Sequence, residues 1–399
     1  MARSGTRLQG TSMKTIGYVL ANFPVLSETF VLTEMRAMMR RGHRIVPIVM
    51  GRSDGPRQPD NGDIAAMALH LDQIPAGAVA GLLPRAGRGL AQALCFARAQ
   101  QGLPRRSLLW SSARIAAAAR ARGCTHLHAH FAQGATAHAI VAARLIGAGV
   151  SFVCHGHDIY QHPIDLAPKL ASADAVLAVC EDMRADLAAI APGAAVVNAP
   201  CGVDAERFRP RPEAGTNHRL LFVGRLIDCK GVDDLLWALA RLPPERRPGL
   251  DIVGDGPLKD GLMAMADELG LDASVAFKGV RSSEWIAEHG PAYMAFVGPF
   301  RPAADGLKDT GPLVVKEAMA MGLPVIATRQ MGLKETVDTA SGFLAEPGDR
   351  PSLLAALERL LALDPDQRAA LGRGARARVL ERFTDLRQAE TLSRLVEAA

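Results

Sequence analysis

The chain has 399 residues, of which 49% are hydrophobic and 22% are charged. This balance is typical of globular proteins and excludes intrinsic disorder and fibrous repeats. A single hydrophobic core stops growing well below this length, so we expect two domains with a cleft between them.

Charge is unevenly distributed along the chain. The net charge is +5, yet residues 1–200 hold 20 Lys and Arg against 12 Asp and Glu, and the remainder is slightly acidic. Between Gln73 and His157 there is no acidic residue. The nine arginines of that stretch are Arg85, Arg88, Arg98, Arg105, Arg106, Arg114, Arg120, Arg122 and Arg144.

Arginines interleaved with Leu, Phe and Trp predict binding to an anionic membrane surface, although a solvated arginine-rich helix face gives the same pattern. Nucleic-acid binding is not indicated, because aromatic residues are few and no recognised binding motif occurs. The sequence has no apolar run long enough for a transmembrane helix and no signal-peptide pattern at its start. None of the six cysteines forms a CxxC pair, so we expect reduced thiols. We therefore expect a cytoplasmic protein, peripheral on the inner face of the cell membrane.

Short apolar runs alternate with helical stretches in the first half. The runs that predict strands are 15–21, 44–50, 126–131, 150–156 and 175–180. Between the first two, Ser27 can cap a helix that ends at Arg41, with Gly42 just beyond it.

A loop rich in Pro, Gly and charge follows at 198–218, and we expect a hinge there. The strand pattern then restarts at 219–225, 250–256, 274–280, 293–299 and 324–329. The predicted fold class is therefore α/β, with two facing Rossmann-like domains, each built on a parallel sheet. We place these domains at 1–200 and 201–383, with a terminal helix at 384–399 that can pack back on the first.

Ligands of open parallel sheets bind at the turns that follow the strands. The first such turn of the second domain contains Gly224, Arg225 and Lys230, and two cations beside a glycine suit a diphosphate. A surface lysine and an ion-paired arginine would also explain them. Gly254 opens the next turn, where it would let the backbone approach the same ligand, although one glycine motif is a weak signal.

Asp309 and Glu317 lie on either side of a turn that opens a predicted helix. The Asp309 carboxylate can bind hydroxyls of a sugar, and Glu317, one turn into the helix, can bind those of a ribose. Both acids would also favour the helix N-terminus electrostatically. The remaining donor-binding candidates, whose backbone can face phosphate oxygens, are Gly311, Pro312, Leu313 and Val314.

Histidines gather in the first domain. His155 follows an apolar strand and should point into the cleft, toward the leaving phosphate or the sugar, although a buried, satisfied histidine is the default interpretation. His126, His128 and His130 share one face of a strand. We predict no metal there, because no nearby carboxylate or cysteine completes the set, and we assign His130 to the acceptor side.

Together these motifs resemble the retaining family 4 glycosyltransferases, whose fold is called GT-B. The resemblance covers nearly the whole chain, since 22–35, 128–132, 151–160 and 198–210 are similar to the colanic-acid and exopolysaccharide branch. The first twelve residues fall outside it, which makes Met13 a candidate start.

The resemblance implies an enzyme that transfers a hexose-type sugar from a nucleotide-sugar to a membrane-associated or lipid-linked glycan, with retained configuration and without a metal or other cofactor. It implies that Arg225 and Lys230 bind the diphosphate and that Glu317 binds the ribose. It also implies that Asp309 contacts the donor sugar and that His155 lines the reaction centre.

The chain departs from the family at two places. The family usually has Glu where Asp309 stands, and one methylene less changes the reach of the carboxylate, which bears on donor choice. The turn FPVLSET replaces a Gly-Gly loop, so Ser27, Glu28 and Thr29 become candidates for phosphate or acceptor contact.

Three other functions stay open at this point. A sugar-nucleotide epimerase or hydrolase would form product without an acceptor, and a non-catalytic sugar-nucleotide binding protein would bind the donor without turnover. A metal hydrolase built on the histidines would lose its activity with a chelator.

Overall fold

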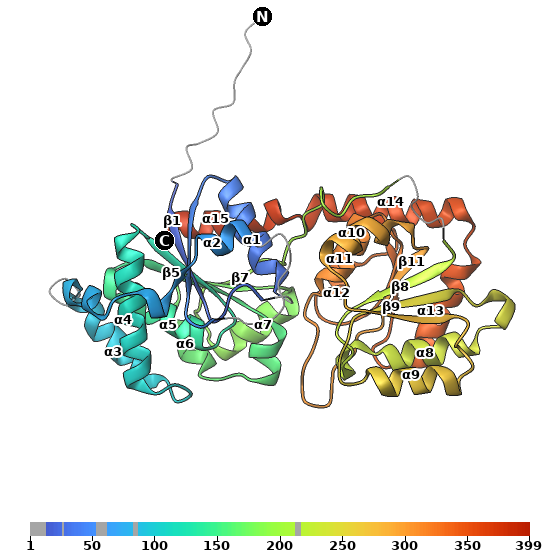
Figure 1. Cartoon of the computed structure of the whole chain (residues 1–399), viewed down its shortest axis with the longest axis horizontal. Coiled ribbons are helices and arrows are strands. Elements are labelled where there is room, and N and C mark those ends of the chain that lie inside the picture. The colour runs from blue at the N-terminus through green and yellow to red at the C-terminus, as the bar shows by residue number, and fades with distance from the viewer. Residues whose placement is uncertain (1–12, 26–27, 53–61, 83–86, 212–216) are drawn as a thin grey trace, which may run out of the picture.

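The computed structural model describes residues 13–25, 28–52, 62–82, 87–211 and 217–399. Figure 1 shows two α/β lobes side by side, with the last two helices running along one edge of both. Within the described residues, no helix combines the length and the apolar character that crossing a bilayer requires.

The first lobe is built on a seven-stranded sheet of order β3-β2-β1-β4-β5-β6-β7, in which all neighbours pair in parallel. Its strands are β1 (Thr15–Leu20), β2 (Arg44–Val49), β3 (Leu69–His70), β4 (His126–His130), β5 (Gly149–Cys154), β6 (Ala175–Ala178) and β7 (Val196–Asn198). Its helices are α1 (Thr29–Arg40), α2 (Gly62–Ala66), α3 (Gly87–Ala99), α4 (Arg105–Ala121), α5 (Gly134–Ile146), α6 (Leu166–Ser172) and α7 (Glu181–Ile190).

The second lobe is built on a six-stranded parallel sheet of order β10-β9-β8-β11-β12-β13. Its strands are β8 (Arg219–Val223), β9 (Gly249–Val253), β10 (Val275–Gly279), β11 (Ala295–Gly298), β12 (Val325–Thr328) and β13 (Gly342–Ala345). Its helices are α8 (Val232–Arg241), α9 (Lys259–Glu268), α10 (Ser283–His289), α11 (Leu313–Ala320), α12 (Leu333–Thr336), α13 (Arg350–Ala362) and α14 (Pro365–Arg382). The buried apolar residues of this lobe form two clusters. One contains residues of α8, α9 and α13, and the other contains residues of α10, α11 and α14.

The predicted α/β class with two parallel sheets is confirmed. All ten predicted strands form, because central strands covered on both faces by helices are continuous apolar runs. Strands β3, β7 and β13 were not predicted, since each has four residues or fewer and lies at a sheet edge. All six cysteines are free, and Cys95 on α3 is exposed while the other five are buried.

Helix α1 begins at Thr29 and ends at Arg40, close to the predicted bounds. The predicted cap, Ser27, lies outside the described residues. The face that packs on the sheet contains the buried Val31, Met35 and Met38, as its 3.6-residue period predicts.

Two segments cross between the lobes, side by side. The backbone N–H of Val203 donates to the carbonyl of Phe383 at 2.9 Å, and the N–H of Asp385 donates to the carbonyl of Val203 at 3.0 Å. The first crossing falls in the predicted hinge, and the second lies where the terminal helix expected at 384–399 begins. The backbone pairing between the two crossings was not predicted. We call these paired segments, 199–208 and 383–385, the double hinge.

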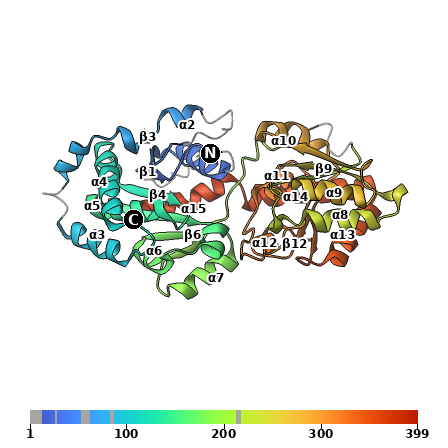
Figure 2. The same cartoon turned by 60° about the horizontal axis from the view of Figure 1, so that its bottom comes forward.

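Beyond the double hinge the chain returns to the first lobe as α15 (Asp385–Ala398), which lies among its elements in Figure 2. Arg40 of α1 forms an ion pair with Asp385, and His43 Nε2 lies 2.7 Å from the hydroxyl of Ser393. The C-terminal helix is therefore a structural part of the first lobe.

Candidate active site

Each sheet has one point where its strand order reverses. In the first sheet it lies between β1 and β4, and in the second between β8 and β11. Ligands of open α/β sheets bind beyond the carboxyl ends of the strands at such switch points. Lys230 follows β8 and Asp309 follows β11, while His130 ends β4, so candidate residues of both lobes lie at switch points.

Three turns at the carboxyl edge of the second sheet contact one another through their backbone atoms. The N–H of Gly224 donates to the carbonyl of Val253 at 3.0 Å, and that of Gly254 donates to Gly279 at 2.9 Å. Gly254 has a φ of 142°, and a Cβ there would lie 1.9 Å from the carbonyl oxygen of Gly224. Only glycine fits such an approach. Arg225 follows Gly224 and is exposed at this edge.

Lys230 and Asp309 form an ion pair at the second switch point. Lys230 Nζ donates to both oxygens of Asp309, at 3.0 and 2.8 Å, and lies 5.0 Å from the centre of the Phe300 ring. The side chains are only 13% and 20% exposed, so solvent screens this pair less than a surface pair. The structure thus joins one predicted diphosphate ligand to the predicted sugar ligand.

Glu317 lies one turn into α11, as predicted. Pro312 precedes this helix, so Leu313 and Val314 occupy its first turn, where backbone N–H groups lack partners within the helix. Burial raises the pKa of the Glu317 carboxyl to about 7, although the positive charge of Arg207 opposes the shift. The carboxyl group therefore changes its charge near neutral pH.

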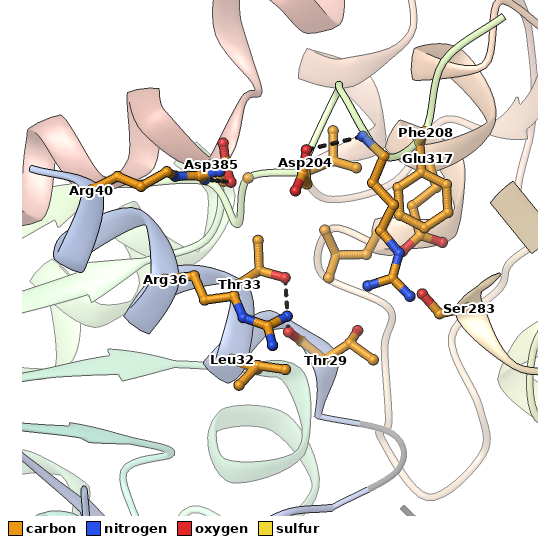
Figure 3. A pocket seen from close by; sticks show the side chains of 14 residues that line it. Thr29, Leu32, Thr33, Arg36, Arg40, Asp204, Phe208, Ser283, Glu317 and Asp385 are labelled. Atoms are coloured by element: carbon orange, nitrogen blue, oxygen red, sulfur yellow. Dashed lines mark hydrogen bonds and ion pairs between the residues drawn. The ribbon is translucent and has the colours of Figure 1, made fainter. Parts of the chain in front are cut away.

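Glu317 faces a pocket between the lobes. Figure 3 shows it beside Phe208 and Ser283 of the second-lobe side, opposite Thr29 and Thr33 of α1. Hydroxyl groups and a carboxyl group thus converge from both lobes, which suits a ligand rich in hydroxyls.

His155 follows β5 and is half-buried at the carboxyl edge of the first sheet. Its ring lies 4.6 Å from the ring of Phe30 and 4.5 Å from that of Phe131, between centroids. Burial, together with the charge of His130, lowers the pKa of His155 well below its usual value, so the imidazole is neutral at pH 7. A neutral imidazole can exchange hydrogen bonds with a sugar or phosphate without adding charge.

Asp158 holds the loop that carries His155. Its carboxylate accepts a hydrogen bond from the His155 N–H at 2.9 Å and another from the Ala132 N–H at 2.6 Å. Burial raises the pKa of Asp158 to about 7, although these backbone donors oppose the shift. Sequence reasoning gave Asp158 no role of its own, although its place next to His155 was a usable signal.

The lobes meet directly beside the two predicted catalytic residues. A Cβ on Gly156 would lie 2.3 Å from the carbonyl oxygen of Lys308. Gly156 adjoins His155, and Lys308 adjoins Asp309. Further along, Gln161 Nε2 donates to Asp305 at 2.5 Å. The backbone contact brings the His155 loop and the Asp309 loop together across the cleft.

The expectation that no carboxylate accompanies the histidines is wrong. Glu34 of α1 is fully buried, and its Oε1 lies 3.1 Å from His128 Nε2 and 3.2 Å from His130 Nε2. Sequence reasoning missed Glu34 because it is 96 positions from His130. A usable signal existed, since Glu34 lies three residues after Val31 and four before Met38, on the core-facing side of α1.

Glu34, His128 and His130 have the atoms and spacing to hold a metal ion. Protein donors already occupy the carboxylate, however, since the Tyr18 hydroxyl donates to Oε1 at 3.0 Å and the Gln388 amide donates to Oε2 at 2.6 Å. Hydrogen bonding therefore accounts for the cluster, and the absence of a required metal stays a prediction.

The acceptor-side candidates are placed differently from one another. His130 is only 4% exposed and lies behind His155, so its side chain supports the cleft without lining it. Glu28 precedes α1, and burial raises its pKa while the charge of His130 opposes the shift. Thr29 lines the pocket between the lobes.

Models of two protein families match adjoining parts of the chain. The family described as Glycosyltransferase Family 4 matches residues 27–207, and the family described as Glycosyl transferases group 1 matches residues 204–378. The boundary between the two matches falls in the double hinge.

Two relatives illustrate the similarity. The GDP-mannose-dependent alpha-(1-6)-phosphatidylinositol monomannoside mannosyltransferase of Mycolicibacterium smegmatis is 35% identical over 269 residues, covering 61% of this chain and 70% of that protein. The putative colanic acid biosynthesis glycosyltransferase WcaL of Escherichia coli is 27% identical over 409 residues, covering 96% of this chain and 99% of that protein.

Among solved structures, Anabaena HepE in complex with UDP and glucose superposes with a TM-score of 0.71. The match covers 97% of this chain and 100% of HepE at 17% sequence identity. At this identity the likeness concerns the fold alone, and it places both lobes in one common architecture.

Proposed function

The chain belongs to the family 4 glycosyltransferases of the GT-B fold, and we propose that it transfers a hexose-type sugar from a nucleotide-sugar to a membrane-associated glycan with retained anomeric configuration. The observation that carries the proposal is the contact across the cleft between the loop of His155 and the loop of Asp309, which is ion-paired with Lys230. Loops that carry a cation, a carboxylate and a neutral imidazole thus meet at the cleft, where a sugar diphosphate would react in this proposal.

The second lobe holds the donor in this proposal. Arg225 and Lys230 bind the diphosphate, with the first N–H groups of α11 as further donors to its oxygens. Glu317 binds the ribose hydroxyls, and Asp309 contacts the transferred sugar. The backbone edge at Gly224, Gly254 and Gly311, together with Pro312, leaves room for the nucleotide.

The reaction we propose is a substitution on one face of the sugar. A bond forms between the acceptor oxygen and the anomeric carbon while the bond to the leaving phosphate breaks, and the acceptor proton passes to an oxygen of that phosphate. Lys230, Arg225 and the α11 N-terminus neutralise the charge that develops on the leaving group. These groups supply this stabilisation without a metal ion.

The acceptor is membrane-associated in this proposal, and α3 and α4 provide a surface for the membrane. Arg88 and Arg98 on α3 and Arg105 and Arg106 on α4 are exposed, and Trp110 is 49% exposed. Each basic residue near an anionic surface contributes about 1 kcal/mol. Arg114 is different, because it donates to the carbonyl of Ile74 and stabilises the lobe.

Vesicle sedimentation tests this surface. The double variant Arg105→Glu, Arg106→Glu should bind vesicles of 30% phosphatidylglycerol more weakly, by roughly tenfold or more, and binding should fall with salt. Equal binding of wild type and variant would remove the arginine surface from the proposal.

The transfer itself is tested with a panel of UDP-, GDP- and dTDP-sugars, with and without membrane extract, scored for released nucleoside diphosphate. Release that requires extract, persists with EDTA and yields a product with the donor's anomeric configuration by NMR supports the proposal. Release without extract would indicate an epimerase or hydrolase, and binding without release would indicate a binding protein. Loss of activity with EDTA would indicate metal-dependent chemistry.

A further inference from the structure

A path of hydrogen bonds leads from the double hinge to His155. The backbone N–H of Gly202 donates to Gln388 Oε1 at 2.7 Å, and Gln388 Nε2 donates to Glu34 Oε2 at 2.6 Å. The other carboxylate oxygen, Oε1, lies 3.2 Å from His130 Nε2, and His130 Nδ1 lies 3.2 Å from His155 Nε2. Four successive contacts therefore connect the hinge backbone to a residue of the reaction centre.

The chemistry of each group determines which partner donates and which accepts in the hydrogen bonds along this path. A backbone N–H can only donate, so the Gln388 oxygen must face Gly202 and its amide NH₂ must face Glu34. The Tyr18 hydroxyl donates to Oε1 of Glu34 and the Gln388 amide donates to Oε2, so both oxygens act as acceptors. Burial by itself raises the pKa of Glu34, but the neighbouring His130 and His128 outweigh it and hold the pKa well below its usual range. Glu34 is therefore an ionised carboxylate, which only accepts.

The histidine tautomers follow from this direction. Because Glu34 only accepts, the neutral form of His130 is the one with its proton on Nε2 and its lone pair on Nδ1. The Nδ1 lone pair needs a donor, which only His155 Nε2–H provides at this contact. His155 then has its own lone pair on Nδ1.

We propose that Glu34 is a positioning residue that fixes, through the neutral form of His130, the imidazole of His155 in its Nε2-protonated tautomer. The role of His155 in sugar transfer rests on the proposed function, whereas the tautomer does not. In this form His155 Nδ1 accepts a hydrogen bond from a sugar hydroxyl and cannot donate one to a phosphate. His155 is thereby selected as a ligand of a sugar rather than of the diphosphate.

The surroundings of Glu34 suit this role. Its side chain is 0% exposed, and a buried charge persists only when its acceptor sites are filled, as Tyr18, His130 and Gln388 fill them here. Gln388 lies on α15, so the return of the C-terminal helix to the first lobe supplies one of these donors. The helix thus supports the reaction centre without reaching it.

Replacing Glu34 by glutamine should exchange the donor and acceptor roles of the ring nitrogens of His130 and His155. Since Gly202 keeps the Gln388 NH₂ facing residue 34, the new amide must turn its oxygen toward Gln388 and its NH₂ toward His130. His130 Nε2 then accepts, its Nδ1 carries the proton, and His155 Nε2 becomes an acceptor. Glu34→Gln therefore moves the His155 proton from Nε2 to Nδ1 with little change in shape.

The test is the nitrogen NMR spectrum of the full chain labelled with ¹⁵N-histidine, recorded at an alkaline pH at which the His130 signals are those of a neutral ring. His130 and His155 are assigned by single His→Gln variants. In the wild type, His155 Nε2 should be a protonated, pyrrole-type nitrogen, and in Glu34→Gln it should become an unprotonated, pyridine-type nitrogen. The matched control is Ser151→Ala, which removes a buried hydroxyl 2.7 Å from both His126 and His128 but leaves His130 alone. It should keep the wild-type His155 signals.

A pyridine-type His155 Nε2 in the wild-type protein would overturn the proposal, and so would an unchanged His155 in a folded Glu34→Gln variant. The wild-type spectrum decides the question if that variant does not fold.

Kinetic measurements distinguish this proposal from the proposed function. Glu34→Gln should lower kcat roughly tenfold to a hundredfold with the donor KM nearly unchanged. If the wild type turns over no donor, the proposed function fails, while the NMR result still decides the tautomer.

Discussion

Lys230 donates to both carboxylate oxygens of Asp309, at 3.0 and 2.8 Å, so the two residues at the second switch point are bound to each other. One follows β8 and the other follows β11, the neighbouring strand. A diphosphate that binds Lys230 shares the lysine with Asp309, and the negative charge of Asp309 opposes its entry. In the proposed function, the ion pair therefore holds the Lys230 amine in place before the nucleotide binds and lowers the affinity for it.

Replacing Lys230 by alanine should lower the catalytic efficiency strongly. We expect Lys230→Ala to lower kcat/KM by roughly 10²–10³, because a cation that stabilises the leaving group is removed. The measurement is steady-state release of nucleoside diphosphate. Lys278→Ala is the matched control, since Lys278 is another second-lobe lysine beside an aspartate, 3.5 Å from Asp251, and should leave the rate unchanged. Equal losses in both variants would point to a general effect of charge.

Removing the charge of Asp309 should separate binding from turnover. We expect Asp309→Asn to bind free nucleoside diphosphate about fivefold more tightly, since roughly 1 kcal/mol of competing ion pairing is lost. Its kcat should nevertheless fall, because the sugar loses a carboxylate contact. Calorimetry with UDP and GDP measures the first effect and turnover the second. Weaker nucleotide binding in the variant would show that Asp309 does not compete for Lys230.

Nucleotide affinity should depend on pH through Glu317. Burial raises the pKa of this carboxyl to about 7, so it is neutral below that pH and charged above it. A carboxylate accepts ribose hydroxyls better than a carboxylic acid does, so affinity should rise from pH 6 to pH 8. The raised pKa also means that ionisation lowers folded-state stability as pH rises from about 4.5 toward 7, and this contribution levels off above 7.

Calorimetric titrations at several pH values measure this dependence, and Glu317→Gln isolates it from other groups that titrate near neutral pH, such as Asp158. In that variant the rise attributed to Glu317 should vanish. A pH dependence of the same size in the variant would contradict the assignment of the ribose contact.

The contact between the lobes should be sensitive to a single methyl group. Gly156 has φ −69° and ψ −37°, a backbone conformation that alanine adopts freely, yet an added Cβ would lie 2.3 Å from the Lys308 carbonyl oxygen. We expect Gly156→Ala to lower kcat at least about tenfold by separating the two loops, because small displacements at a reaction centre are costly. Gly62→Ala has open space around it and is the matched control.

Thermal unfolding and small-angle scattering accompany the kinetics of these glycine variants. The melting temperature of Gly156→Ala should stay near that of wild type, because neither lobe is changed internally, while the average separation of the lobes increases. Full activity in this variant would show that the 156–308 contact is not needed for turnover.

The fold was predictable from the sequence because its strands are short apolar runs between helices, a pattern that parallel sheets require. The short edge strands β3, β7 and β13 were less predictable, since each has four residues or fewer and leaves a weaker signal. The backbone pairing of the second crossing with the first was not foreseen, because a single pairing between distant segments has no local signature.

The sequence predicted which positions belong to the candidate site, but not which side chains contact one another there. Turn residues such as Lys230, Asp309 and His155 are recognisable because they follow strands, but their partners depend on which side chains face each other where distant elements cross. Glu34 meets His130 and Gln388 for this reason, 96 and 354 positions away. Local periodicity places Glu34 on the buried face of α1 and says nothing about what it meets there.

The most direct measurement is transfer of a radiolabelled sugar from a nucleotide to the lipid-linked glycan of a membrane extract, with wild type and Lys230→Ala compared side by side. We expect label in the glycan fraction for the wild type, dependent on both donor and extract, and at least a hundredfold less label for the variant, within the roughly 10²–10³ range expected for its loss. Label that stays on the nucleotide, or is found only as free sugar, would contradict the assignment of this chain as the enzyme that extends such a glycan.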